Sequence, residues 1–89
     1  MATFLVESYE PRGRAQEVTQ LEARARAAAR ACGGRYVHSI LTPEDELCLY
    51  VFESPSRERL EEAARAAGFG SVRVTEASEF PRNRKEDAR

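Results

Sequence analysis

The residues of this sequence best suited to chemistry are its single histidine, His38, and one of its two cysteines, Cys48. They lie on two predicted strands joined by a short turn, and simple hairpin pairing across that turn sets them opposite each other. Cross-strand neighbours have Cβ atoms roughly 4.5–5.5 Å apart, close enough for an imidazole and a thiolate to share a nickel, zinc or copper ion. Glu7, on the predicted first strand, would add a carboxylate. One histidine and one cysteine do not close a four-ligand site, so a dimer would have to supply the rest by symmetry.

The same residues allow other interpretations. Packing alone also explains them, with His38 bonded to a tyrosine or a backbone group and Cys48 acting as a small buried hydrophobe. Alternatively, His38 would be the general base of a small enzyme, because histidine is the side chain that exchanges protons near neutral pH. A Cys48–His38 nucleophilic pair is less favoured, because no third group is placed to orient it. The residues predicted to surround His38 in a pocket are Leu5, Glu7, Tyr36, Ile40, Tyr50 and Arg73.

The composition limits the classes of function. A chain of 89 residues forms one domain with a thin core, which dimerisation would help to stabilise. A net charge of −1 does not provide the basic field that nucleic-acid binding needs, and it gives no reason to expect an anionic membrane as partner. The sequence shows no signal peptide, and no apolar run approaches the ~20 residues of a transmembrane helix. Together with the low cysteine content, these features predict a cytoplasmic protein.

Periodic patterns predict the elements that position these side chains. Alternating apolar residues indicate strands at Thr3–Tyr9, Arg35–Leu41, Glu46–Glu53 and Ser71–Ala77. Apolar residues at steps of three and four predict a first helix over Glu17–Cys32. A second helix is expected to begin at Ser54-Pro55, with Ser54 as its N-cap, and to stop at Gly68. We therefore expect one domain over residues 1–80 and a disordered charged tail over 81–89.

The order of these elements, βαββαβ, predicts a fold. With right-handed crossovers it gives a four-stranded antiparallel sheet with both helices on one face, the α+β ferredoxin-like plait. The other face of the sheet is then uncovered, and we expect Leu5, Ile40, Tyr50 and Phe52 to lie there. Monomers rarely leave such an apolar area in water. The sequence therefore predicts a homodimer joined through the open sheet face, of the dimeric α+β barrel type, or a small organic ligand lying on that face.

Three segments also carry a resemblance to a known family. They are FLVES at 4–8, YVHSILTPEDELCLYVFESPS at 36–56, and the AARAAGF and VRVTEA stretches within 63–77. On these segments the chain resembles the small nickel-responsive, nickel-binding ferredoxin-like proteins of actinobacterial type, otherwise described as a domain of unknown function. The resemblance implies a plait that dimerises through its open sheet face and binds nickel. A nickel-binding homodimer is thus the leading expectation, with a small enzyme or a non-catalytic accessory subunit as alternatives.

Overall fold

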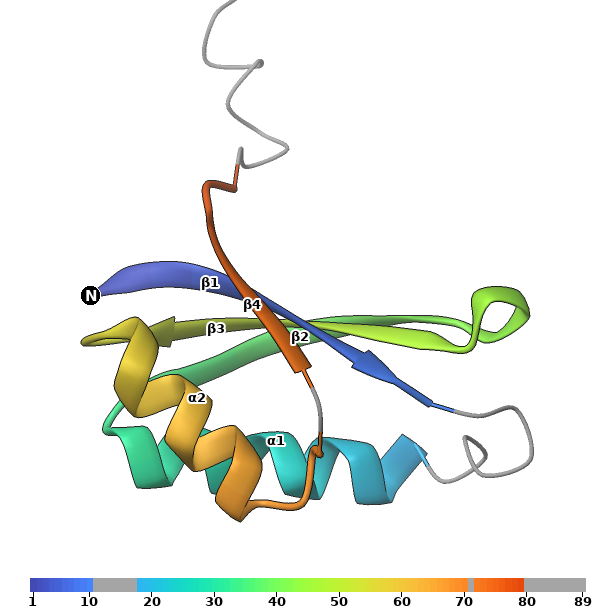
Figure 1. Ribbon diagram of the computed structural model, residues 1–89, viewed down its shortest axis with the longest axis horizontal. Helices are drawn as coiled ribbons and strands as arrows, with labels where there is room; N and C mark the ends of the chain where they lie inside the picture. The colour runs from blue at the N-terminus through green and yellow to red at the C-terminus, as the bar shows by residue number, and fades with distance from the viewer. Residues whose placement is uncertain (11–17, 71, 80–89) are drawn as a thin grey trace, which may run out of the picture.

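The computed structural model describes residues 1–10, 18–70 and 72–79. Its elements are β1 (Ala2–Tyr9), α1 (Val18–Cys32), β2 (Arg35–Thr42), the 3-10 turn η2 (Pro43–Asp45), β3 (Leu47–Ser54), α2 (Arg57–Ala66) and β4 (Val72–Ala77). The strands form one antiparallel sheet in the order β2-β3-β1-β4, and both helices lie on the same side of it (Figure 1). The predicted ferredoxin-like plait is confirmed. The tail predicted over 81–89 lies outside the described residues.

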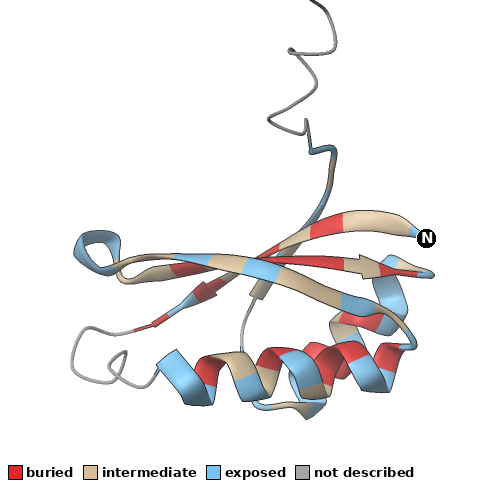
Figure 2. Ribbon diagram, turned by 180° about the vertical axis from the view of Figure 1, so that it is seen from behind, coloured by how far each residue is buried: buried red, intermediate tan, exposed pale blue. Residues whose placement is uncertain are grey.

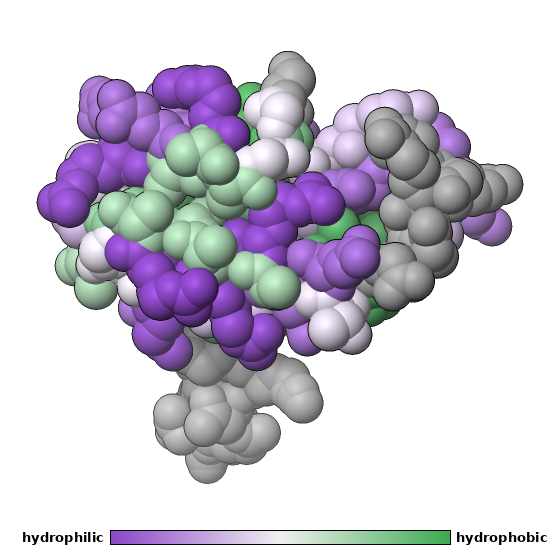
Figure 3. Space-filling view, turned by 90° about the horizontal axis from the view of Figure 1, so that it is seen from below, coloured by the Kyte–Doolittle hydropathy of each residue, from purple (hydrophilic) through white to green (hydrophobic). Residues whose placement is uncertain are grey.

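Each helix has a buried side made mostly of small residues. The residues that α1 buries are Leu21, Ala25, Ala28, Ala29 and Cys32, and those that α2 buries are Leu60, Ala63 and Ala64. Buried and exposed positions alternate along α1 accordingly (Figure 2). The outer surface of the helix layer is mainly hydrophilic, with a paler apolar patch among the hydrophilic side chains (Figure 3). No helix in the described parts of the chain is both long and apolar enough to span a membrane.

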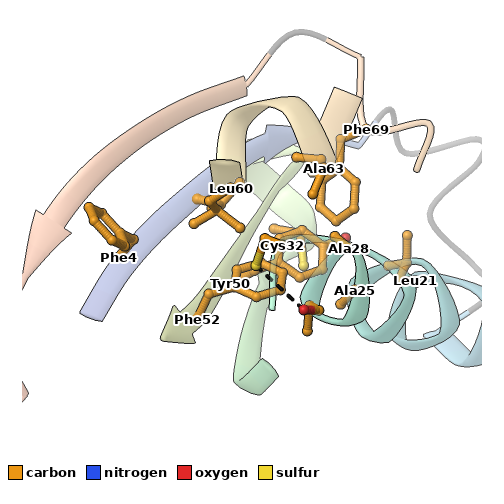
Figure 4. Close-up of a cluster of buried hydrophobic side chains, with 14 residues drawn as sticks. Phe4, Leu21, Ala25, Ala28, Cys32, Tyr50, Phe52, Leu60, Ala63 and Phe69 are labelled. Carbon is orange, nitrogen blue, oxygen red and sulfur yellow. Dashed lines mark hydrogen bonds between the residues drawn. The ribbon is translucent and has the colours of Figure 1, made fainter. Parts of the chain in front are cut away.

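Large aromatic side chains fill the space that these small helix residues leave. Phe4 from β1, Tyr50 and Phe52 from β3, and Phe69 from the loop after α2 form the core with the helix residues (Figure 4). Protein interiors are packed about as densely as organic crystals, so two alanine-rich helix faces need a bulky sheet face against them. This requirement decides which face of β3 turns toward the helices.

The predicted orientation of β3 was wrong. Tyr50 and Phe52 were expected on the open face, but both are fully buried against the helices. Leu49 instead lies on the open face, next to Leu5 and Ile40, which were predicted there correctly. Alternation with a period of two defines two faces of a strand, and on β3 both are apolar. Packing against the helices decides which of the two faces is buried, and the sequence of the strand alone gives no information about that packing.

Strand β2 contains a bulge that the sequence analysis did not predict. Tyr36 pairs with Phe52, but His38 pairs with Val51, so Val37 is an extra residue in the ladder. A bulge changes the face on which the following side chains lie. Tyr36 therefore points toward the helices, where its ring centroid lies 5.7 Å from that of Phe52, whereas His38 points to the open side.

The predicted start of the second helix was two residues too early. The N-cap is Ser56, whose Oγ accepts a hydrogen bond from the backbone N–H of Arg59 at 3.1 Å. Ser54 is the last residue of β3, and its Oγ donates to the Ser56 carbonyl at 2.8 Å. Both serines are good capping residues, but β3 extends one residue further than predicted and includes Ser54, so Ser56 caps the helix.

Candidate functional site

The predicted site residues divide between the two faces of the sheet. The open face holds Leu5, Glu7, His38, Ile40 and Arg73, and the helix side holds Tyr36, Cys48 and Tyr50. The predicted pairing of His38 with Cys48 is wrong, because Cys48 pairs with Leu41. The described residues therefore do not form the single pocket in which two tyrosines would flank a His38 general base.

The centre of the open face is apolar. One row of neighbouring residues runs across the sheet from His38 through Val51 and Leu5 to Thr75. The next row runs from Ile40 through Leu49 to Glu7 and Arg73. The Ile40 side chain is 52% exposed, while Leu5 and Leu49 are partly exposed. No helix lies over this side of the sheet in the described structure (Figure 1).

His38 has a carboxylate partner that the sequence analysis missed. Its Nε2 lies 3.8 Å from Oε2 of Glu79, and both side chains are about half exposed. Glu79 follows β4, which is the sheet edge opposite to β2, and after β4 the chain rises on the side of the sheet away from the helices (Figure 1). Nothing in the local pattern around Glu79 predicts such a contact. Imidazole and carboxylate together are suitable ligands for nickel or zinc.

Glu7 does not belong to this pair within one chain. It lies two strands away from His38 and two residues along the sheet, which places the two Cα atoms roughly 12 Å apart. Its cross-strand neighbour on β4 is Arg73. Within residues 1–10, 18–70 and 72–79, no three His, Cys, Asp or Glu side chains gather closely enough to hold a metal ion.

The helix side of the sheet has a buried polar end. The inward positions of β1 begin with Phe4 and Val6, and the inward series ends in the polar residues Ser8 and Glu10. The carboxylate of Glu10, a residue only 6% exposed, accepts a hydrogen bond from Ser8 Oγ at 3.0 Å and lies 3.6 Å from Nη1 of Arg24. A buried carboxylate needs such partners. The strand predicted over Thr3–Tyr9 ends one residue before Glu10, so the sequence pattern gave no sign of this buried carboxylate.

Tyr50 and Cys48 complete this polar end. The Tyr50 hydroxyl is buried and has no hydrogen-bond partner within the described residues. The Cys48 thiol lies beside it, but a thiol is a weak hydrogen-bonding group. Burial raises the pKa of both groups, so both stay protonated at neutral pH. Cys48 is buried on the helix side of the sheet, away from His38 on the open face.

Comparisons of the chain with protein-family models, with curated proteins and with solved structures found no match. The resemblance to nickel-binding proteins therefore stays a prediction from the sequence. The function has to be argued from the two faces of the sheet.

Proposed function

We propose that this protein is a homodimer joined through the open faces of its two sheets, and that the dimer binds a divalent metal ion such as nickel. The observation that carries the proposal is an apolar sheet face, uncovered in the described structure, with the His38–Glu79 pair lying on it. A second copy of the chain is the occupant that this face fits best.

The apolar centre of the face supports a dimer. Leu5, Leu49 and Ile40 form one continuous area with Val51, and contiguous areas of this kind usually mark an interaction site. A domain of this size buries a small core, so covering the face adds a substantial share of apolar burial. Two-fold dimers bury the same patch on both protomers, so Leu5 and Leu49 would pack against this same apolar area of the second copy.

The charges on the face are compatible with a second copy. Arg35 Nη2 lies 3.1 Å from Glu53 Oε2, and this partner holds the pKa of Glu53 below its ordinary value. Glu7 and Arg73 are cross-strand neighbours of opposite sign. Because Glu53 and Glu7 each have an arginine beside them, these two carboxylates add no net repulsion where two such faces meet.

The residues fit a divalent metal only in part. His38 and Glu79 offer two ligands per chain, and a two-fold dimer with its axis near His38 would offer four, the number of a closed zinc-type site. Glu7 of the partner subunit is a further carboxylate on the same face. Cys48 is buried on the helix side of the sheet, away from this pair, so the proposed ligand set leaves it out. The metal would act as a link between the two protomers.

Sedimentation equilibrium tests the dimer. We expect the mass of two chains for the wild type and of one chain for Leu49→Lys, with an unchanged circular dichroism spectrum. Ala31→Lys, on the exposed side of α1, is the matched control and should remain dimeric. A wild type that is monomeric at about 100 μM, far above the Kd of a specific interface, would contradict the proposal.

Isothermal titration calorimetry with nickel tests the metal separately. We expect binding that His38→Ala abolishes and that Glu79→Gln weakens, whereas Cys48→Ala binds as the wild type does. If the protein is a dimer but takes up no nickel, the proposed metal site is contradicted and the proposed interface is not. Uptake lost in Cys48→Ala but kept in His38→Ala would show that the ligands are assigned wrongly.

A further inference from the structure

The hydroxyl of Tyr50 is the least satisfied polar group in the described core. Its residue has no exposed surface, and the hydroxyl has no hydrogen-bond partner there. Native proteins rarely keep a buried polar atom without a protein, water or ligand partner. The Tyr50 ring and the Arg24 guanidinium both pack against Phe69, and Arg24 lies beside Glu10, so Tyr50 lies near the polar end of the core.

Phe69 lies against Tyr50 at this end of the core. The two rings meet edge to face with their centroids 4.9 Å apart. Figure 4 shows the Phe69 side chain directed from the loop after α2 toward Tyr50. The guanidinium carbon of Arg24 lies 5.6 Å from the centroid of the Phe69 ring. The Phe69 ring thus covers the same region that the hydroxyl and the Glu10–Arg24 pair border.

The main chain at Phe69 is held by a hydrogen bond, and a glycine with positive φ lies on each side of it. Its backbone N–H donates to the Ala64 carbonyl at 3.0 Å, which fixes the turn that ends α2. Gly68 and Gly70 on either side have φ of 95° and 76°, and a Cβ at either position would meet no atom within 4 Å. Phe69 lies in the loop after α2 and not in the helix itself, and displacing its ring would vacate the volume of one six-membered ring.

We propose that Phe69 covers a binding site for a small uncharged aromatic compound that carries a hydroxyl or carbonyl group, with Tyr50 as its hydrogen-bond donor. The ligand ring would take the place of the Phe69 ring against Tyr50 and Arg24. Its polar group would accept from the Tyr50 hydroxyl, and a ligand hydroxyl would in turn donate to Glu10. The ligand is uncharged because Glu10 and Arg24 already neutralise each other, and a further charge would be buried without a partner.

Phenol is the simplest compound of this class, and it is the probe for the test. We would titrate the full-length ¹⁵N-labelled protein with phenol and follow the backbone amide shifts. We expect saturable shifts at Tyr50, Phe69 and Arg24 with a Kd in the millimolar range, and at least a roughly fivefold weaker Kd in Tyr50→Phe. Tyr36→Phe is the matched control, since its hydroxyl lies on the same side of the sheet but is bonded to Ser39 at 2.8 Å, and it should bind phenol as the wild type does.

Phe69→Ala provides an independent arm. Removing the covering ring should tighten phenol binding, because the space is then already open. Toluene, which has the ring but no hydroxyl, should bind the wild type more weakly than phenol. Absence of saturable shifts in the wild type, equal phenol binding by Tyr50→Phe, or equal binding of toluene and phenol would each overturn the proposal. The site lies on the helix side, so none of these outcomes depends on the proposed dimer or metal.

Discussion

At the scale of single residues, the lack of a hydrogen-bond partner for the Tyr50 hydroxyl within the described residues leads to a prediction about the free energy of unfolding. Tyr50→Phe removes a buried polar atom that has no partner, so the free energy of unfolding without ligand should stay the same or rise by up to about 1 kcal/mol. Tyr50→Ala removes the ring from the core and should lower that free energy by about 3–5 kcal/mol. Urea denaturation measures both. A loss above about 1 kcal/mol in Tyr50→Phe would mean that the hydroxyl is bonded in the folded protein.

The two thiols make a second prediction at this scale. Cys32 and Cys48 are both free and almost wholly buried. The thiolate is the reactive form, and a raised pKa lowers its fraction at any given pH, so Cys48 should resist modification in the folded protein. With Ellman's reagent near pH 8 we expect almost no reaction in the native state and two reactive thiols per chain in guanidinium chloride. Rapid reaction of native Cys48 would show that the polar end of the core opens readily.

At the scale of elements, the approach of β2 to β3 depends on the glycine that immediately precedes β2. A Cβ added at Gly34 would overlap the backbone carbonyl oxygen of Glu53, and backbone cannot move aside as a side chain can. Gly34→Ala should therefore lower the free energy of unfolding by more than about 2 kcal/mol. Gly68→Ala is the comparison, because it meets open space and should cost about 1 kcal/mol from its positive φ alone. Equal losses in thermal unfolding would contradict this explanation.

The start of α2 depends on one capping hydrogen bond. Ser56→Ala removes the acceptor of the Arg59 N–H and should cost about 1 kcal/mol of stability. Ser56→Asp keeps an acceptor and adds a negative charge at the helix N-terminus, so it should retain or exceed wild-type stability. Chemical denaturation of the three proteins measures the effect. If Ser56→Ala matched the wild type, the cap would contribute nothing.

At the scale of the whole molecule, dimerisation and folding should be linked. If the folded protomers associate through the open face and the unfolded chains do not, mass action raises Tm with protein concentration. We expect such a rise for the wild type in differential scanning calorimetry and a Tm independent of concentration for Leu49→Lys. A wild-type Tm that does not change over a hundredfold range of concentration would show that the face remains free.

The sequence predicted the whole-molecule architecture better than its site. The alternation in Thr3–Tyr9 and the helical stripe ending at Cys32 were enough to order the elements, because each is a local pattern. The face of Tyr50 was not predictable, since it depends on the size of helix residues far along the chain. The bulge at Val37 leaves no pattern of its own, yet it separates His38 from Cys48. The contact between His38 and Glu79 likewise depends on the path of the chain after β4.

The bulge at Val37 also affects how the sheet can grow. Strand β2 is an outer strand, and its free backbone N–H and C=O groups could template an added strand from another molecule. An extra residue breaks the even spacing of those groups and increases the local twist. A foreign strand therefore cannot form a continuous ladder along this edge. The consequence is protection against open-ended, fibre-like stacking along the β2 edge of the sheet.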